Sequence, residues 1–117
     1  MLTKLKYYSE EIELRNQVAK KYNENLSPKF FPQSIPKGFN SVWAQYSILA
    51  ESNEHRKLIM KKLKENEIPS AIYYPKPLHL QKAFNPLGCK IGDFLISENI
   101  SERIFSLPMH PYLSDQD

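Results

Sequence analysis

The chain has 117 residues, of which 41% are hydrophobic, 12% aromatic and 25% charged. This composition excludes a disordered chain and is typical of one folded domain, because enough apolar side chains are present to form a core. The net charge of +3, without a block of like charge, excludes the basic arm of a nucleic-acid-binding protein.

Residues 3–26 are predicted to form a long amphipathic helix. The apolar residues that recur near one face at helical spacing are Leu5, Tyr8, Ile12, Ala19 and Tyr22. Pro28 ends the pattern, because the residue before a proline is pushed out of helical geometry. A helix this long in so small a chain is expected to lean on something else. We therefore expect two parts, an interdomain-type helix at 1–26 and a small domain at 27–117.

Residues 27–40 are expected to be an extended connector rather than regular structure. They contain three prolines and one glycine, while their phenylalanines indicate that the connector packs on a surface. The next segment, SVWAQYSILA at 41–50, is rich in strand-forming residues and predicts a strand. On this strand Tyr46 and Ile48 share one face with Val42 and Ala44.

A second helix is predicted at 54–66, packed on this strand. Ser52 and Asn53 give a helix start signal, and Pro69 follows the end. The run Ala-Ile-Tyr-Tyr at 71–74 predicts a second strand that enters a proline-rich loop.

A short helix within 93–103 and a third strand at 104–107 complete the expected elements. Their order predicts an α+β fold with one small mixed sheet of about three strands packed with helices, preceded by the long N-terminal helix.

Cys89 is the only cysteine, which excludes an intrachain disulfide and predicts a cytoplasmic protein. No segment approaches the about 20 apolar residues that cross a bilayer, so no membrane partner is expected. No metal site is expected either, because Cys89, His79 and His110 match no recognised ligand spacing.

Two of the three histidines follow predicted strands in proline-stiffened loops, where sheet proteins often place ligand contacts. These are His79 and His110, whereas His55 is expected to be an exposed surface residue. For His79 and His110 the alternative is a histidine that bonds backbone groups and closes the core. Tyr73, Tyr74 and Trp43 are candidates to stack on a sugar or a base, with core packing as their alternative.

Three segments resemble a known family when they are taken in order: SVWAQYSILA, HRKLIMKKLKENEIPSAIYYPKPLHLQKAF and SERIFSLPMHPYLSDQD. They are similar to the C-terminal small domain of the DegT/DnrJ/EryC1/StrS family of pyridoxal phosphate (PLP)-dependent sugar aminotransferases, a fold-type I architecture. The resemblance covers essentially the whole chain. Within the family, it is closest to enzymes that aminate 3-keto sugars on UDP-linked N-acetylglucosamine-type uronic acids.

The resemblance implies amination of a keto sugar on a nucleotide carrier, with glutamate as donor, in cell-surface polysaccharide biosynthesis. It also implies that the lysine that bonds PLP, and the carboxylate that tunes the ring nitrogen, belong to an N-terminal domain that this sequence does not contain. No catalytic residue and no bound PLP are therefore expected for this chain alone. A further family helix would follow residue 117, and its absence is expected to favour self-association.

The substrate-binding residues implied by the resemblance are Tyr73, Tyr74, Lys76, His79, His110 and Tyr112. Lys76 is expected to meet a sugar-nucleotide phosphate, and Tyr74 and His79 to bond the hexose, with Trp43 packed beneath them. The partners implied are the PLP-binding domain and a nucleotide sugar. The alternative function is a non-enzymatic remnant or association module that dimerises without substrate.

Overall fold

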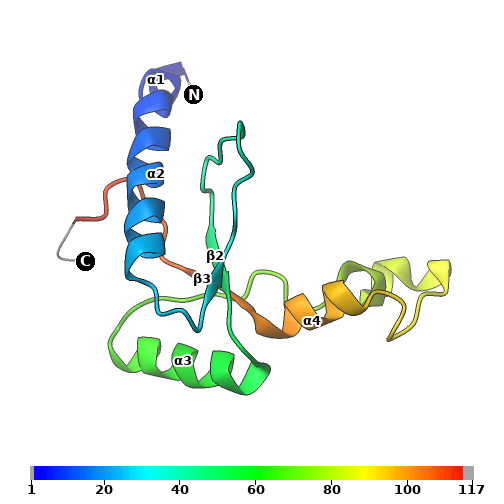
Figure 1. Ribbon diagram of the computed structural model, residues 1–117. Helices are drawn as coiled ribbons and strands as arrows, with labels where there is room; N and C mark the ends of the chain where they lie inside the picture. Colours follow the sequence, from blue (N-terminus) through cyan, green and yellow to red (C-terminus); the bar gives the residue numbers. More distant parts are fainter. Residues whose placement is uncertain (1, 115–117) are drawn as a thin grey trace.

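The computed structural model describes residues 2–114 of the chain. A three-stranded antiparallel sheet, in the order β1-β2-β3, lies at the centre, with helices beside it, beneath it and on a projecting arm (Figure 1). The strands are β1, Phe31–Pro32; β2, Tyr46–Leu49; and β3, Ile104–Leu107. This arrangement confirms the predicted α+β class, in which a small sheet is packed with helices and preceded by a long N-terminal helix.

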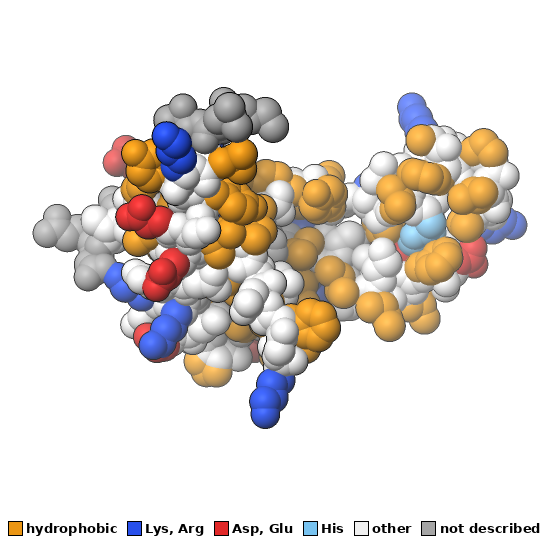
Figure 2. All heavy atoms as spheres, turned by 90° about the horizontal axis from the view of Figure 1, so that it is seen from above, with side chains coloured by type: hydrophobic (Ala, Val, Ile, Leu, Met, Phe, Trp, Pro, Cys, Tyr) orange, Lys and Arg blue, Asp and Glu red, His pale blue; other side chains and the backbone are white. Residues whose placement is uncertain are grey.

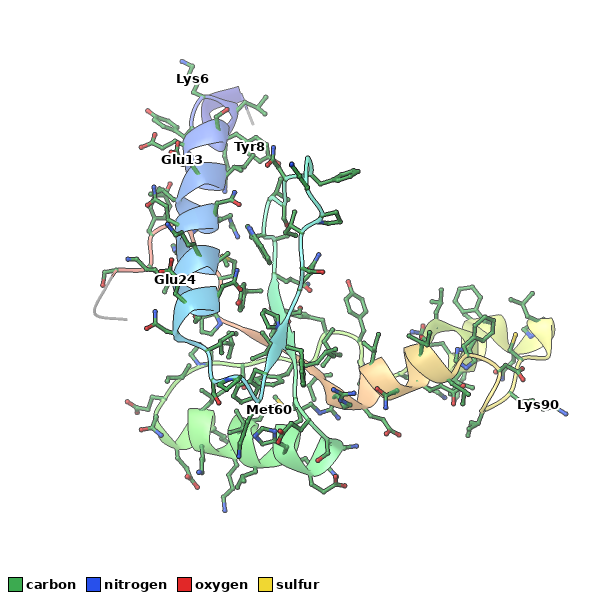
Figure 3. All side chains as sticks on the ribbon, viewed as in Figure 1. Lys6, Tyr8, Glu13, Glu24, Met60 and Lys90 are labelled. Carbon is green, nitrogen blue, oxygen red and sulfur yellow. The ribbon has the colours of Figure 1, made fainter. Side chains whose placement is uncertain are left out.

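The predicted N-terminal helix is present with a break near its start. Helix α1 spans Leu2–Leu5 and helix α2 spans Tyr8–Asn25. The C-terminal half of α2 packs on the sheet, because Ala19 is 2% exposed and the Tyr22 ring stacks on Tyr46 with centroids 4.7 Å apart. Helix α1 and the start of α2 are different, since the side chains of Leu5 on α1 and Tyr8 on α2 remain exposed. Tyr8 projects from α2 toward the 33–45 segment in Figure 3.

The strand predicted at 41–50 is confirmed only over its second half. Trp43 adopts φ +45°, in the left-handed region that bulky residues avoid, and this interrupts the extended backbone before β2 begins. The predicted alternation of side chains between the two faces of a strand therefore fails at Trp43. Tyr46 and Ile48 are buried as expected, but Trp43 is buried with them, whereas Val42 is 48% exposed.

Two further strand predictions need correction. The connector contains strand β1, which the three prolines concealed, and Phe31 pairs with Leu49 at the sheet edge. Pro32 is compatible with this position, because an edge strand does not need every backbone N–H. The strand predicted at 71–74 is reduced to a single bridge between Ala71 and Ser106.

Helix α3, Asn53–Glu65, begins where the sequence predicts it. The Ser52 hydroxyl caps it by accepting a hydrogen bond from the His55 N–H at 3.1 Å. The expectation that His55 is exposed is wrong. Its side chain is 18% exposed, and its ring stacks on Phe30 with centroids 5.2 Å apart. The connector thus packs on α3 through Phe30.

Residues 74–103 form the arm, which projects away from the sheet and carries Lys90 near its far end (Figure 3). It contains the 3₁₀ helices η1, Leu78–Leu80, and η2, Lys82–Leu87, followed by α4, Leu95–Arg103. The radius of gyration is 16.7 Å, compared with about 13 Å for a compact chain of this length. The chain is therefore more extended than a compact domain, and much of the surface of the arm is exposed to solvent.

The core is small, and half of its buried hydrophobic residues are aromatic. Its buried hydrophobic members are Ala19, Trp43, Tyr46, Ile48, Ala50 and Phe105. Helix α3 covers this cluster from one side through Ile59, Met60 and Leu63, which are partly buried against it.

Raising the pH above 10 is expected to destabilise the fold through Tyr46. Burial, reinforced by the neighbouring Tyr22, raises the pKa of Tyr46 from 10.0 to about 12. The unfolded chain therefore releases this proton first, and the free energy of unfolding falls as the pH rises from 10 toward 12. Denaturant unfolding at stepped pH measures this slope. Tyr46→Phe is expected to flatten it, and the exposed-site control Tyr7→Phe to leave it unchanged. An unaltered slope in Tyr46→Phe would contradict the assignment.

Candidate functional site

The six predicted substrate-binding residues lie in three separate places. Tyr74 and Lys76 line a groove on the arm, and His79 lies in η1 of the same arm. Tyr73 is exposed and lines a neighbouring hollow beside β3. The remaining two, His110 and Tyr112, lie on the loop after β3, next to α2. The structure therefore does not bring the six residues together.

The arm groove is open and has a volume of about 950 Å³. One wall comes from residues 74–81 and the other from 92–104, at the start of and along α4. Most of the groove surface is apolar. Figure 2 shows hydrophobic side chains gathered on the arm, which lies at the right of that view. The charged side chains on the lining of the groove are Lys76 and Asp93. Such a groove combines apolar contact area with a few polar groups, as ligand sites do.

His79 is engaged by a carboxylate beneath the groove. Its Nε2 lies 3.0 Å from Glu98 Oε1, and the two side chains are only 9% and 17% exposed. The Phe94 ring lies against the His79 ring with centroids 4.7 Å apart. His79 does not line the groove, and its partner is a carboxylate side chain, not the backbone groups that the alternative expected, so it contributes to the packing of the arm.

Glu98 also accepts hydrogen bonds from the backbone. The Gly92 N–H donates to both carboxylate oxygens, at 2.9 and 3.0 Å, and the Phe94 N–H donates to Oε1 at 3.3 Å. Burial alone would raise the pKa of the Glu98 carboxyl. The hydrogen bonds from Gly92, Phe94 and His79 outweigh this effect, so its pKa lies below the usual value. Glu98 therefore carries its negative charge in neutral solution.

His110 and Tyr112 fix the loop after β3 instead of facing the arm groove. The Tyr112 N–H donates to His110 Nδ1 at 3.1 Å, and the Tyr112 hydroxyl donates to Glu11 Oε1 on α2 at 2.9 Å. The bond to Glu11 raises the pKa of Tyr112. This contact joins segments 101 residues apart in the sequence. These two side chains therefore attach the C-terminal loop to α2.

Trp43 does not lie beneath the predicted substrate-binding residues. Its Nε1–H donates to Asn16 Oδ1 at 3.0 Å, and its carbonyl accepts from Arg15 Nη1 at 3.0 Å. Both partners are on α2. Trp43 therefore holds the 33–45 segment against that helix, and these bonds offset the strain of its left-handed backbone.

Glu98 is the residue of this region that the sequence analysis did not single out. The sequence could have indicated its contact with the backbone, because an acidic side chain in the first turn of a predicted helix often accepts hydrogen bonds from the backbone N–H groups there. Its pairing with His79, 19 residues away, depends on the path of the arm and has no sequence signature.

The resemblance implies the coenzyme PLP, and the surroundings of the lysines show whether this chain could bond it. A lysine that bonds PLP is enclosed with the coenzyme, near a carboxylate that faces the ring nitrogen. Every lysine of the chain, from Lys4 to Lys90, is exposed. The residues of this chain therefore do not fit the coenzyme by themselves.

Residues 2–114 contain neither a metal cluster nor a membrane-spanning helix. Their His, Cys, Asp and Glu side chains form no group of three that could hold a metal ion. None of the helices in this range combines the length and the apolar character that crossing a membrane requires.

Comparisons with known proteins match most or all of the chain. The sequence profile of the DegT/DnrJ/EryC1/StrS aminotransferase family matches residues 1–117. UDP-2-acetamido-2-deoxy-3-oxo-D-glucuronate aminotransferase from Pseudomonas aeruginosa is 33% identical over 114 residues, which cover 97% of this chain and 30% of the relative. UDP-N-acetyl-3-dehydro-alpha-D-glucosamine 3-aminotransferase from Acidithiobacillus ferrooxidans is 34% identical over 84 residues, 69% of this chain and 21% of the relative.

Solved structures give the same result. The crystal structure of a DegT DnrJ EryC1 StrS aminotransferase from Brucella abortus superposes with a TM-score of 0.89 at 44% identity, covering 100% of this chain and 31% of that one. A candidate sugar aminotransferase from Streptococcus pneumoniae, solved in its PLP form, has a TM-score of 0.85 at 27% identity, covering 98% and 30%. The chain spans about a third of the length of these proteins. It belongs to the DegT/DnrJ/EryC1/StrS aminotransferase family.

Proposed function

We propose that this chain is the C-terminal small domain of a PLP-dependent nucleotide-sugar aminotransferase and does not catalyse the reaction alone. The observation that carries this proposal is the family match over residues 1–117. The identity to aminotransferases that are named for UDP-linked 3-keto sugars supports the substrate class. Glutamate as amino donor, cell-surface polysaccharide biosynthesis and a cytoplasmic location are part of the same proposal.

PLP bound elsewhere in the enzyme would supply the electron sink for moving the amino group. This chain would contribute binding of the nucleotide sugar. Lys76, on the lining of the arm groove, presents a point charge for a phosphate. Tyr74 lines the same groove, is 67% exposed, and carries a hydroxyl that can bond a sugar. His79 is bonded to Glu98, His110 to Tyr112, and Tyr112 to Glu11. Tyr73 lines a separate hollow. We therefore keep Tyr74 and Lys76 as the ligand contacts.

The exposed surface supports a protein partner. The accessible surface is 9188 Å², about 2,600 Å² more than a compact monomer of 13.7 kDa exposes. This excess is larger than the about 600–1,500 Å² of an ordinary interface between domains. The large hydrophobic side chains that the arm exposes outside the groove include Leu87 and Ile91, each at least 70% exposed. We propose that the PLP-binding part of the enzyme, together with a second copy, covers the exposed surface outside the groove.

Lys76→Ala is expected to weaken binding of UDP-N-acetylglucosamine by about tenfold, because it removes the charge that faces the phosphates. Titration of the chain, followed by chemical-shift changes of residues 74–81 and 92–104, measures the affinity. The matched control is Lys82→Ala, which removes another exposed lysine of the arm that does not line the groove. Equal affinities of the two variants would contradict the role of Lys76.

The second candidate function is a non-enzymatic association module. The exposed apolar side chains of the arm favour it, because surfaces of this kind mark protein contacts. The same titration separates the two functions. Shift changes confined to the arm groove support the substrate-binding domain, whereas concentration-dependent dimerisation without any response to the UDP-sugar supports the association module.

A further inference from the structure

The Glu98 side chain contacts both segments that form the walls of the arm groove. Through His79 it reaches η1, and the adjacent residue Leu78 lines one wall. Through the backbone N–H groups of Gly92 and Phe94 it holds the other wall, since both of these residues line the groove. The carboxylate thus ties the walls together across 19 residues of sequence.

The chemistry of this cluster requires an anion with two acceptor oxygens. The Gly92 N–H is shared between both oxygens, and Oε1 also receives the Phe94 N–H and lies 3.0 Å from His79 Nε2. An ionised carboxylate only accepts, so the partner ring must present its proton at Nε2. In the neutral ring this leaves Nδ1 without a proton. Glu98 therefore selects one tautomer of His79.

The turn before α4 depends on the same carboxylate. Gly92 has φ +97°, a conformation that favours glycine, so residue 92 can turn its N–H toward Glu98 without a side-chain penalty. The Phe94 side chain, which also lines the groove, lies on the His79 ring at 4.7 Å. Any change at Glu98 is thus transmitted to both walls through groups that it contacts directly.

We propose that Glu98 is a positioning residue, whose carboxylate sets the spacing of the two groove walls and the tautomer of His79, and thereby the affinity of the groove for its ligand. The identity of that ligand as a nucleotide sugar rests on the proposed function. The positioning role itself does not depend on the ligand, because it concerns contacts within the arm.

The test compares Glu98→Gln with Glu102→Gln in the full chain. Glutamine keeps the size of the side chain but replaces one acceptor oxygen with an N–H₂ donor, which cannot accept from Gly92, Phe94 and His79 together. Glu102 is one turn further along α4 and is exposed, so its substitution makes the same charge change outside the cluster. Amide hydrogen exchange and ¹⁵N spectra of the His79 ring are recorded for both variants, and each is titrated with UDP-N-acetylglucosamine.

In Glu98→Gln we expect the Gly92 and Phe94 amides to exchange about tenfold faster or more, since charge-assisted bonds are lost. The His79 ring is expected to change from one tautomer to a mixture, and the affinity for the UDP-sugar to fall about tenfold. Glu102→Gln is expected to behave as the unaltered chain. Unchanged exchange and an unchanged ring in Glu98→Gln would overturn the proposal.

Two other outcomes are informative. If amides of β2 and β3 exchange faster to the same degree as those of the arm, Glu98 acts on global stability and the positioning role is overturned. If the unaltered chain does not bind the UDP-sugar while the arm amides and the His79 ring respond as expected, the positioning role stands and the proposed function fails.

Discussion

Phe105→Ala is expected to lower the free energy of unfolding by about 3–5 kcal/mol, the usual cost of removing a buried phenylalanine side chain. Phe105 is 1% exposed on β3, and its ring meets Phe30 edge to face with centroids 6.2 Å apart. The substitution would leave a cavity among Phe30, Ile48 and the other core residues. With a core as small as this one, the variant is expected to lose much of its stability.

Denaturant unfolding followed by fluorescence of the buried Trp43 measures this effect. The matched control is Phe39→Ala, because Phe39 is 71% exposed on the 33–45 segment. We expect the control to change the free energy of unfolding by less than about 0.5 kcal/mol. Equal effects of the two substitutions would show that Phe105 is not at the centre of the core.

Arg56→Met is expected to cost about 2–3 kcal/mol, since a methionine of similar length fills the space but donates no hydrogen bond. Arg56 lies on α3 and is only 9% exposed. Its Nη1 donates to the carbonyls of Ser101 at 2.9 Å and Ile104 at 3.2 Å, where α4 ends and β3 begins. A cation is favourable there, because the C-terminal end of a helix carries partial negative charge.

The control for Arg56→Met is Lys57→Met, which removes the charge of the next residue at an exposed position. We expect thermal unfolding to shift clearly for Arg56→Met and little for Lys57→Met. A buried charge also has a desolvation cost. A more stable Arg56→Met variant would therefore mean that this cost exceeds the energy of the two hydrogen bonds.

Helix α3 and strand β3 show what the sequence determines locally. The Ser52 cap depends on neighbours within a few residues, and this prediction is confirmed. The short run at 104–107 also pairs as expected, with Phe105 opposite Ile48. These elements were predictable because their signals are contained in their own segments.

Trp43 and strand β1 show what the sequence does not determine locally. The left-handed backbone at Trp43 is stabilised by Arg15 and Asn16, nearly 30 residues away on α2. The pairing of Phe31 with Leu49 likewise depends on where the connector meets the sheet edge. Propensity alone favoured a longer strand at 41–50 and no strand at 31–32, and tertiary contacts overrode it.

The resemblance nominated residues for the candidate site but not their arrangement, and their role as ligand contacts stays a prediction. The sequence pointed to Tyr74 and Lys76, and both line the arm groove. The resemblance also grouped His110 with Tyr74 and Lys76, because a similarity between sequences carries no information on distances in space. The contact of Tyr112 with Glu11 and the pairing of His79 with Glu98 become visible only in three dimensions.

The most direct test of the central claim is a measurement of glutamate-dependent amination of UDP-2-acetamido-2-deoxy-3-oxo-D-glucuronate. It compares this chain with added PLP to a chimera in which the chain replaces the matched 114-residue segment of the Pseudomonas aeruginosa relative. We predict amination by the chimera and none by the chain alone, because no lysine of the chain is enclosed to bond the coenzyme. Turnover by the isolated chain, or a PLP-loaded chimera without turnover, would contradict the claim.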